Sequence, residues 1–233
     1  MIKLDRPPLA NCELCLFKQL VRQYISEEEF QPLYNRSIQL KYKKGENILK
    51  QGGRFTHIVY LSKGCVKFNY ENEFEKKIIL TIVDSPKLLG GINIFNDELN
   101  MFSITATDEC EACLIDINVL KNLALKNSAL ALRLMEFATS MFRDSILNFI
   151  SLAHKQVSGR VADILIYLSE KIYKSDKFIL TLTRKELSEF AGCSQENIIN
   201  TLSRFHKDGI ICTNVKIIEI LDKSRLAEIS RFG

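Results

Sequence analysis

The sequence predicts an α+β fold in which a roll of short antiparallel strands, one long helix and a compact C-terminal unit follow one another. Residues 38–70 alternate apolar and polar side chains, with glycines about once per strand and turn, which is typical of a jelly roll or barrel. Residues 127–153 change to a helical period without glycine or proline. Residues 183–209 contain two shorter amphipathic patterns separated by a glycine.

The N-terminal part begins with a predicted irregular arm, residues 1–17, which carries Cys12 and Cys15. Residues 20–34 are predicted to be helical, with Ser26 as a cap before three glutamates. The strands of the roll follow from residue 38. Two further segments, residues 76–84 and 102–117, continue the strand character.

The long helical segment, residues 127–153, is apolar over much of its girth and must therefore be covered on more than one side. We expect the roll to cover one side and the same helix of a second copy to cover the other. Burial within a single chain is the alternative. The predicted dimer seam follows a/d spacing and consists of Leu134, Ala138, Met141, Ser145 and Leu152.

Residues 183–209 are predicted to form two helices joined by a tight turn. Thr183 and Glu186 have capping-box spacing, Gly192 can adopt the left-handed conformation that ends the first helix, and Ser194 can cap the second. One face of the second helix is apolar and the other is polar. Such a helix-turn-helix can enter the major groove of DNA, and an ordinary surface αα-hairpin is the alternative.

The segments around this motif complete a winged helix-turn-helix. We predict a helix over residues 160–174, a strand over 178–182, a two-stranded wing turning at Thr213 and Asn214, and a short closing helix. Residues 154–159 are the predicted boundary. The expected organisation is a sensor arm and β-roll in residues 1–126, a dimerisation helix in 127–154 and a DNA-binding domain in 155–233.

Composition limits the classes of function. The formal net charge of the 233-residue chain is +4, which permits nucleic-acid binding without proving it. No apolar run approaches membrane-spanning length, and we expect a cytoplasmic protein without a membrane partner. No phosphate-binding loop or nucleophile motif is present, and neither C-x-x-C pair has βαβ context. We therefore expect no enzymatic activity.

Four stretches, in this order, resemble the CRP/FNR family of bacterial transcription regulators over nearly the whole chain. They are YKKGENILKQGG with IVYLSKGCVKF, LLGGINIF, RVADILIYL, and TRKELSEFAGCSQENIINTLSRFHKDGII. The resemblance implies a cyclic-nucleotide-binding-type β-roll and a homodimer that binds a pseudo-palindromic site on double-stranded DNA. It also implies RNA polymerase as a partner if the protein activates transcription.

The resemblance also implies which residues read DNA. Glu196 stands at the family's glutamate position, whereas Asn200 replaces the arginine that follows four residues later, with Ile199 before it. Arginine reads guanine and asparagine prefers adenine, so we expect a half-site that departs from the usual family sequences. The candidate DNA-binding residues are Arg184, Lys185, Gln195, Glu196, Asn200, Ser203 and Arg204.

The family's best-known effector is a cyclic nucleotide, held by a Gly-Glu pair and an Arg-Ser pair. These positions are Gly90-Gly91 and Met101-Phe102 here. Both charged side chains are replaced, and a buried phosphate needs charge-assisted hydrogen bonds. The sequence therefore argues against cyclic nucleotide binding.

The cysteines suggest another input. Cys12, Cys15, Cys110 and Cys113 form two C-x-x-C pairs, enough thiolates for a [4Fe–4S] cluster or zinc. The oxygen-sensing branch of the family uses three arm cysteines and one roll cysteine, but Val21 stands near the third arm position, so Cys110 would have to substitute. Residues i and i+3 of a regular strand face opposite ways, so Cys110 and Cys113 can share a metal only through a loop or bulge.

The alternatives to an iron–sulfur cluster are zinc, haem, a thiol switch, or a protein that binds no metal. The three histidines, at 57, 154 and 206, include no evident axial pair for haem. Cys65, Cys193 and Cys212 are expected to be small core residues.

Overall fold

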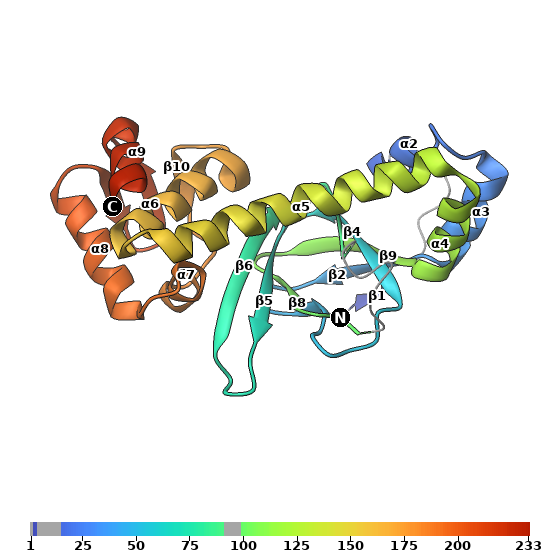
Figure 1. Ribbon diagram of the computed structural model, residues 1–233, viewed down its shortest axis with the longest axis horizontal. Helices are drawn as coiled ribbons and strands as arrows, with labels where there is room; N and C mark the ends of the chain where they lie inside the picture. The colour runs from blue at the N-terminus through green and yellow to red at the C-terminus, as the bar shows by residue number, and fades with distance from the viewer. Residues whose placement is uncertain (1, 4–14, 91–98) are drawn as a thin grey trace. The chain divides into compact units, whose positions relative to one another are not determined.

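The computed structural model describes residues 2–3, 15–90 and 99–233 of the chain. Two compact units are distinguished, one comprising Met1–Phe68 with Val83–Arg143, and the other Asn69–Ile82 with Asp144–Gly233. The labels of Figure 1 are used for their helices and strands.

The first unit is a β-roll of two antiparallel sheets, as the glycine-punctuated alternation predicts. One sheet has the strand order β1-β2-β9-β4-β7 and the other β3-β8-β5-β6, part of which belongs to the second unit. The strands are β1 (Ile2–Lys3), β2 (Ile38–Tyr42), β3 (Asn47–Leu49), β4 (His57–Lys63), β5 (Cys65–Glu71), β6 (Lys77–Asp84), β7 (Lys87–Leu89), β8 (Ser103–Ala106) and β9 (Cys110–Asp116).

Helices enclose one end of the roll. They are α2 (Leu16–Val21), α3 (Glu27–Arg36), α4 (Ile117–Lys126) and the beginning of α5 (Ser128–His154). Ser26 caps α3 in a full capping box with Glu29, which confirms that cap. The helical prediction for residues 20–34 is corrected, because two helices separated by residues 22–26 replace the single one. Their apolar side chains share one core with β4 and β9.

The second unit contains the predicted winged helix-turn-helix. Its elements are α6 (Val157–Tyr167), the π-helix η2 (Leu168–Tyr173), β10 (Lys177–Ile179), α7 (Arg184–Ala191), α8 (Gln195–Lys207), β11 (Ile211–Asn214), β12 (Ile217–Ile220) and α9 (Lys223–Phe232). The sheet order is β10-β12-β11. Asn214 pairs with Ile217, so the wing turns at residues 215 and 216, two residues later than predicted.

One glycine of the roll is required by close packing. Gly64 joins β4 to β5 with φ +91°, and a Cβ there would lie 2.5 Å from the Glu109 carbonyl oxygen and 2.7 Å from Cys110 Sγ. A larger residue would clash with backbone as well as adopt an unfavourable conformation. The β4–β5 turn is therefore packed directly on the start of β9.

Candidate nucleic-acid interface and thiol site

The helix-turn-helix is built by the caps that the sequence predicts. The Thr183 hydroxyl accepts the Glu186 backbone N–H at 3.1 Å, and the Glu186 carboxylate accepts that of Thr183 at 2.7 Å. Gly192 ends α7 with φ +57°, and the Ser194 hydroxyl accepts the Asn197 N–H at 3.1 Å. These contacts define the start of both helices and the turn between them.

Arg160 holds the turn between α7 and α8 in place, a role that was not predicted from the sequence. Its guanidinium donates to the carbonyl oxygens of Ala191 at 2.9 Å and Gly192 at 3.0 Å. Carbonyls at a helix C-terminus carry partial negative charge, which an arginine neutralises. The sequence shows an arginine on the helix before the motif. It lies about thirty residues before the turn, so no helical or strand repeat links the two.

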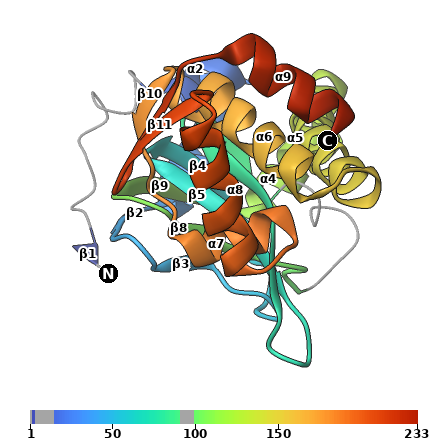
Figure 2. The ribbon, with the colours of Figure 1, turned by 90° about the vertical axis from the view of Figure 1, so that its left-hand side faces the viewer.

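The buried face of α8 is largely apolar. Ile198, Leu202 and Phe205 are at most 3% exposed, and they hold α8 against the rest of the unit, with α7 beside it (Figures 1 and 2). Six of the seven predicted DNA-binding residues have exposed side chains: Lys185, Gln195, Glu196, Asn200, Ser203 and Arg204. The structure thus brings the predicted readers of α8 onto one accessible face.

Arg184 differs from the other six. It is half-buried, and its Nη2 donates to the Val215 carbonyl of the wing at 3.5 Å, whereas Nη1 is buried without a hydrogen-bond partner in the part of the chain that the structure describes. Burial lowers the pKa of this guanidinium. His206 makes a second link, because its Nδ1 accepts the Thr213 N–H at 3.3 Å. Both side chains therefore tie the helices to the wing.

The predicted dimer seam on α5 is corrected for Leu134. This side chain is 2% exposed and belongs to the core of the roll. Leu152 is half-buried against Gly192, where an added Cβ would lie 3.0 Å from Leu152 Cδ2. Ala138 and Ser145 are half-buried, and the side chain of Met141 lies outside what the structure describes.

A different stripe of α5 is exposed. Leu132 is 63%, Met135 54%, Ile146 41% and Phe149 68% exposed, and Thr139 and Ala153 are also exposed. These positions follow one another at intervals of three, four and seven residues, which fit a coiled-coil seam. We call Leu132, Met135, Thr139, Ile146, Phe149 and Ala153 the exposed stripe.

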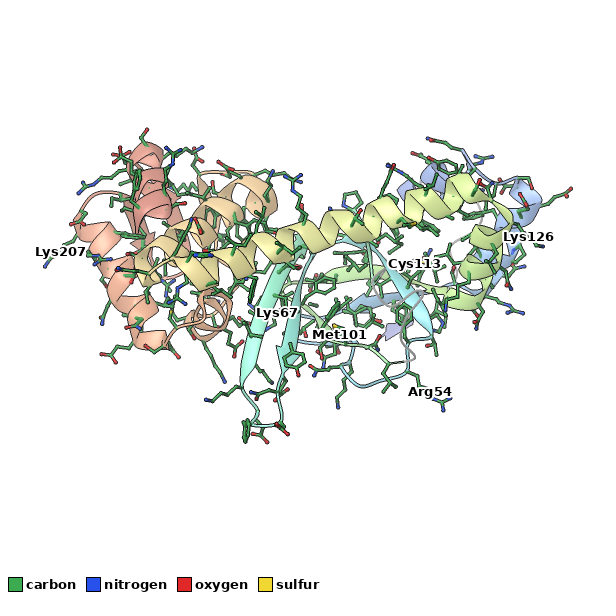
Figure 3. All side chains as sticks on the ribbon, in the orientation of Figure 1. Arg54, Lys67, Met101, Cys113, Lys126 and Lys207 are labelled. Carbon is green, nitrogen blue, oxygen red and sulfur yellow. The ribbon has the colours of Figure 1, made fainter. Side chains whose placement is uncertain are left out.

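Cys15 and Cys113 converge on Tyr60. Cys113 and Tyr60 are direct partners between β9 and β4, and the ring of Phe17, two residues after Cys15, lies 5.5 Å from the Tyr60 ring. Burial raises the pKa of Tyr60 to about 12, and the nearby Cys15 and Cys113 sulfurs add to the shift. Both cysteines are half-buried on the same core cluster, with Cys113 labelled in Figure 3. Cys12 lies outside the described residues.

Cys110 does not join them, and its predicted place in the ligand set is corrected. The pairing of β9 with β2 runs without a shift from Cys110 to Leu114, so Cys110 and Cys113 face opposite ways. The Cys110 Sγ donates to the Cys65 carbonyl oxygen at 3.2 Å. Burial raises the pKa of Cys65 and of Cys110 to about 12, so both remain neutral thiols near pH 7.

The remaining cysteines and the positions that hold a cyclic nucleotide in the family differ in their burial. Cys65 is buried as expected, whereas Cys193 and Cys212 are only half-buried. Gly90 is buried with φ +90°, and Gly91 lies outside the described residues. Met101 is 53% exposed, and the Phe102 ring packs 5.2 Å from that of Phe68.

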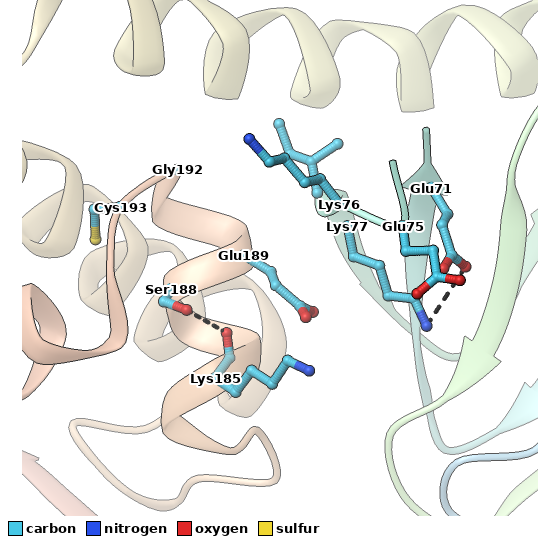
Figure 4. A pocket seen from close by; sticks show the side chains of 10 residues that line it. Glu71, Glu75, Lys76, Lys77, Lys185, Ser188, Glu189, Gly192 and Cys193 are labelled. Carbon is cyan, nitrogen blue, oxygen red and sulfur yellow. Dashed lines mark hydrogen bonds and ion pairs between the residues drawn. The ribbon is translucent and has the colours of Figure 1, made fainter. Parts of the chain in front are cut away.

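A cleft of about 550 Å³ lies inside the second unit, between α7 and the β5–β6 hairpin (Figure 4). The charges along it balance, since three lysines face three glutamates: Lys76, Lys77, Lys185, Glu71, Glu75 and Glu189. Lys77 is already paired with Glu71 at 3.5 Å. This cleft therefore offers no concentrated charge to an anion.

Within the described residues, no helix is long and apolar enough to cross a bilayer.

Comparison with known proteins matches two stretches of the chain to known domain families. The Crp-like helix-turn-helix domain matches residues 159–229, and the cyclic nucleotide-binding domain matches residues 39–127. The transcriptional activator anr of Pseudomonas aeruginosa is 25% identical over 236 residues, covering 98% of this chain and 96% of its own. The transcriptional activator Anr of Pseudomonas protegens is 26% identical over 193 residues, covering 81% and 78%.

Solved structures agree on the fold. FixK2 from Bradyrhizobium japonicum superposes with a TM-score of 0.75 at 16% identity, covering 83% of this chain and 96% of its own. A regulator of the crp/fnr family from Eubacterium rectale gives 0.76 at 18% identity, covering 91% and 97%. The two Pseudomonas relatives are both named as transcriptional activators. Together with the exposed polar face of α8, the matches show that the chain belongs to the CRP/FNR family of DNA-binding transcription regulators.

Proposed function

We propose that the protein is a homodimeric regulator that binds a pseudo-palindromic DNA site through α8 and responds to a redox, oxygen or nitric oxide signal at its cysteines. The exposed polar face of α8 carries the first part of this proposal. The convergence of Cys15 and Cys113 on Tyr60 supports the second. In this proposal residues 1–126 sense, residues 127–154 dimerise and residues 155–233 bind DNA.

The first turns of α8 supply the base readers. Gln195, Glu196 and Asn200 are exposed there, and the N-terminal residues of a recognition helix contact base edges. A glutamate accepts from the cytosine amino group, and asparagine pairs with adenine. Lys185, Ser203 and Arg204, also exposed, would contact phosphates, which set register and affinity. Arg184 would act through the wing, because its guanidinium bonds the Val215 carbonyl.

Selection of binding sites from random duplex DNA tests this readout. We expect a two-fold symmetric site with adenine at the position that Asn200 reads. Asn200→Ala should cost about 1–3 kcal/mol on that site and lose discrimination at that base pair. Lys207→Ala, also exposed on α8 but near its C-terminus, is the matched control. A guanine-reading half-site that is unaffected by Asn200→Ala would contradict the assignment.

The exposed stripe of α5 is the proposed dimer interface. Its apolar side chains would pack against the same residues of a second copy, because a two-fold interface uses one surface twice. A dimer engages two half-sites at once, and this raises affinity far above that of one half-site. A signal that alters the position of α5 would therefore alter DNA binding.

The cysteines near Tyr60 form the proposed sensor site. Cys15 and Cys113 fit a thiolate site, and Cys12 precedes Cys15 by three residues, whereas Cys110 does not fit. Among the described residues, no group of three His, Cys, Asp or Glu side chains converges. A [4Fe–4S] cluster held by Cys12, Cys15 and Cys113 would thus need a fourth ligand from another source. When bound, such a cluster would supply electron exchange and sensitivity to oxygen.

Anaerobic purification with iron, sulfide and zinc analysis tests the sensor. Iron with sulfide, lost in Cys15→Ser and Cys113→Ser but kept in Cys110→Ser, would support a cluster at this site. Zinc alone, haem, or a metal-free protein with an oxidant-dependent thiol change would each identify the alternative input. A colourless, metal-free protein that binds DNA equally with and without oxygen would refute the redox proposal.

The proposal extends to a protein partner and to one alternative function. RNA polymerase is an expected partner if the regulator activates transcription. A dimer that binds no DNA sequence selectively would instead be a non-catalytic interaction module, and the site selection described above distinguishes these outcomes.

A further inference from the structure

One apolar side chain lies among the proposed DNA readers. Ile199 on α8 is 46% exposed, whereas the other large apolar residues of this helix, Ile198, Leu202 and Phe205, are at most 3% exposed. The core of the unit therefore does not account for Ile199. Leaving half of an isoleucine in water forgoes the free energy of its burial, which a partner at this surface can recover.

Helix spacing places Ile199 inside the reading face. It follows Gln195 by four residues and Glu196 by three, and it precedes Ser203 by four. Residues three and four apart are neighbours on a helix surface, and all three neighbours are exposed. Ile199 is also the fifth residue of α8, within the first two turns that approach base edges.

The major groove presents one kind of apolar group, the C5-methyl of thymine. An isoleucine at this place can form no hydrogen bond with a base edge and is complementary only to that methyl group. We propose that Ile199 specifies a thymine in each half-site by packing its side chain against the C5-methyl group. This inference rests on the proposed DNA-binding function and adds the identity of one base.

The size of the effect follows from the methyl group itself. Burying one such group is worth about fourfold in a binding constant. Replacing thymine by deoxyuridine removes only this methyl and leaves every hydrogen-bonding group in place. At the contacted position we expect affinity to fall about fourfold for one half-site and about fifteenfold when both half-sites are changed.

The experiment uses the full-length protein and the duplex obtained by site selection. Each thymine is replaced in turn by deoxyuridine, and affinity is measured for the wild type, Ile199→Ala and Ile199→Val. Ile199→Ala touches an exposed side chain and favours helix, so the fold should persist, as circular dichroism can verify. Leu221→Ala, which removes a leucine that is 57% exposed outside α8, is the matched control.

We expect one thymine per half-site to show the loss with the wild type, Ile199→Val and Leu221→Ala, and no thymine to show it with Ile199→Ala. In addition, 5-methylcytosine placed at that position should bind wild-type protein more tightly than cytosine. A loss that persists undiminished in Ile199→Ala, or a site in which no thymine methyl matters, would overturn the inference while leaving DNA binding intact. Failure to select any DNA site would overturn the proposed function itself, and this inference with it.

Discussion

Replacing Phe149 by alanine should weaken dimerisation and leave the fold of the single chain intact. This side chain is 68% exposed in the single chain. A phenylalanine offers about 200 Å², so about 130 Å² is left for a partner to cover, worth about 3 kcal/mol per chain at ~25 cal/mol per Å². Part of this is retained by alanine or offset on association, which leaves about 2 kcal/mol per chain and about 4 kcal/mol per symmetric dimer. The dimer dissociation constant should rise by roughly three orders of magnitude.

Sedimentation equilibrium over a range of protein concentrations measures this constant, and thermal unfolding reports the fold. Leu134→Ala is the opposite case, because it opens a cavity in the roll core and should cost about 2–5 kcal/mol of stability without a direct effect on association. Leu125→Ala removes an 83% exposed leucine outside the stripe and should change neither quantity. A less than tenfold change for Phe149→Ala would refute the assignment of the exposed stripe.

Two further predictions concern stability and thiol chemistry. Thr183→Ala removes the α7 cap and should lower stability by about 1 kcal/mol, whereas Thr183→Ser should keep it; equal denaturation curves for the two variants would contradict the role of the hydroxyl. Alkylation followed by mass spectrometry near pH 8 should label Cys15 and Cys113 well before Cys65 and Cys110, whose pKa values are raised by burial to about 12 and whose thiolate fraction is only about one in ten thousand. Because these two pKa values lie above the unfolded value, their contribution to stability is complete below about pH 9 and lost as the pH rises toward 12; Cys110→Ala should flatten that alkaline loss.

Local chemistry explains which elements the sequence could predict. The caps at Ser26, Thr183 and Ser194 and the left-handed Gly192 each depend on one or two neighbouring residues. The missed helix α4 also has such a signal, because the Asp116 carboxylate accepts the Asn118 N–H at 2.8 Å. Its apolar residues continue directly from β9, and no helix was predicted for residues 117–126 from the sequence.

The wing turn was misplaced for a different reason. Asn214 is a favoured turn residue, but the chain turns after it, and Val215 adopts φ +50°, a conformation that β-branched residues rarely occupy. The pairing of β12 with both β10 and β11 sets this register. Tertiary pairing thus overrides the local preference of Val215, and no local pattern in the sequence reveals it.

The helix α5 carries two seams with the same heptad spacing, offset from each other by one residue. Periodicity identifies both but cannot decide which one the roll covers. The roll core accepts Leu130 and Leu134, and this choice leaves Leu132 and Met135 in water. The decision depends on where the helix docks, which is a property of the assembled core and not of the helix sequence.

For the cysteines, closeness in the sequence does not predict closeness in the structure. Cys110 and Cys113 are three residues apart and look like a pair in the sequence, yet strand geometry separates them, and the residues that meet at Tyr60 are about a hundred positions apart. Neighbours along a strand share a face only at even spacing, so a C-x-x-C on a regular strand argues against a shared ligand site. Cys113 becomes a candidate sensor residue because Tyr60 is its cross-strand partner and Phe17 brings Cys15 to the same ring. A cluster, zinc ion or thiol switch at this place would therefore join the arm to the roll. Under the proposed function, Cys15→Ser should abolish a response to oxygen and Cys110→Ser should leave it intact.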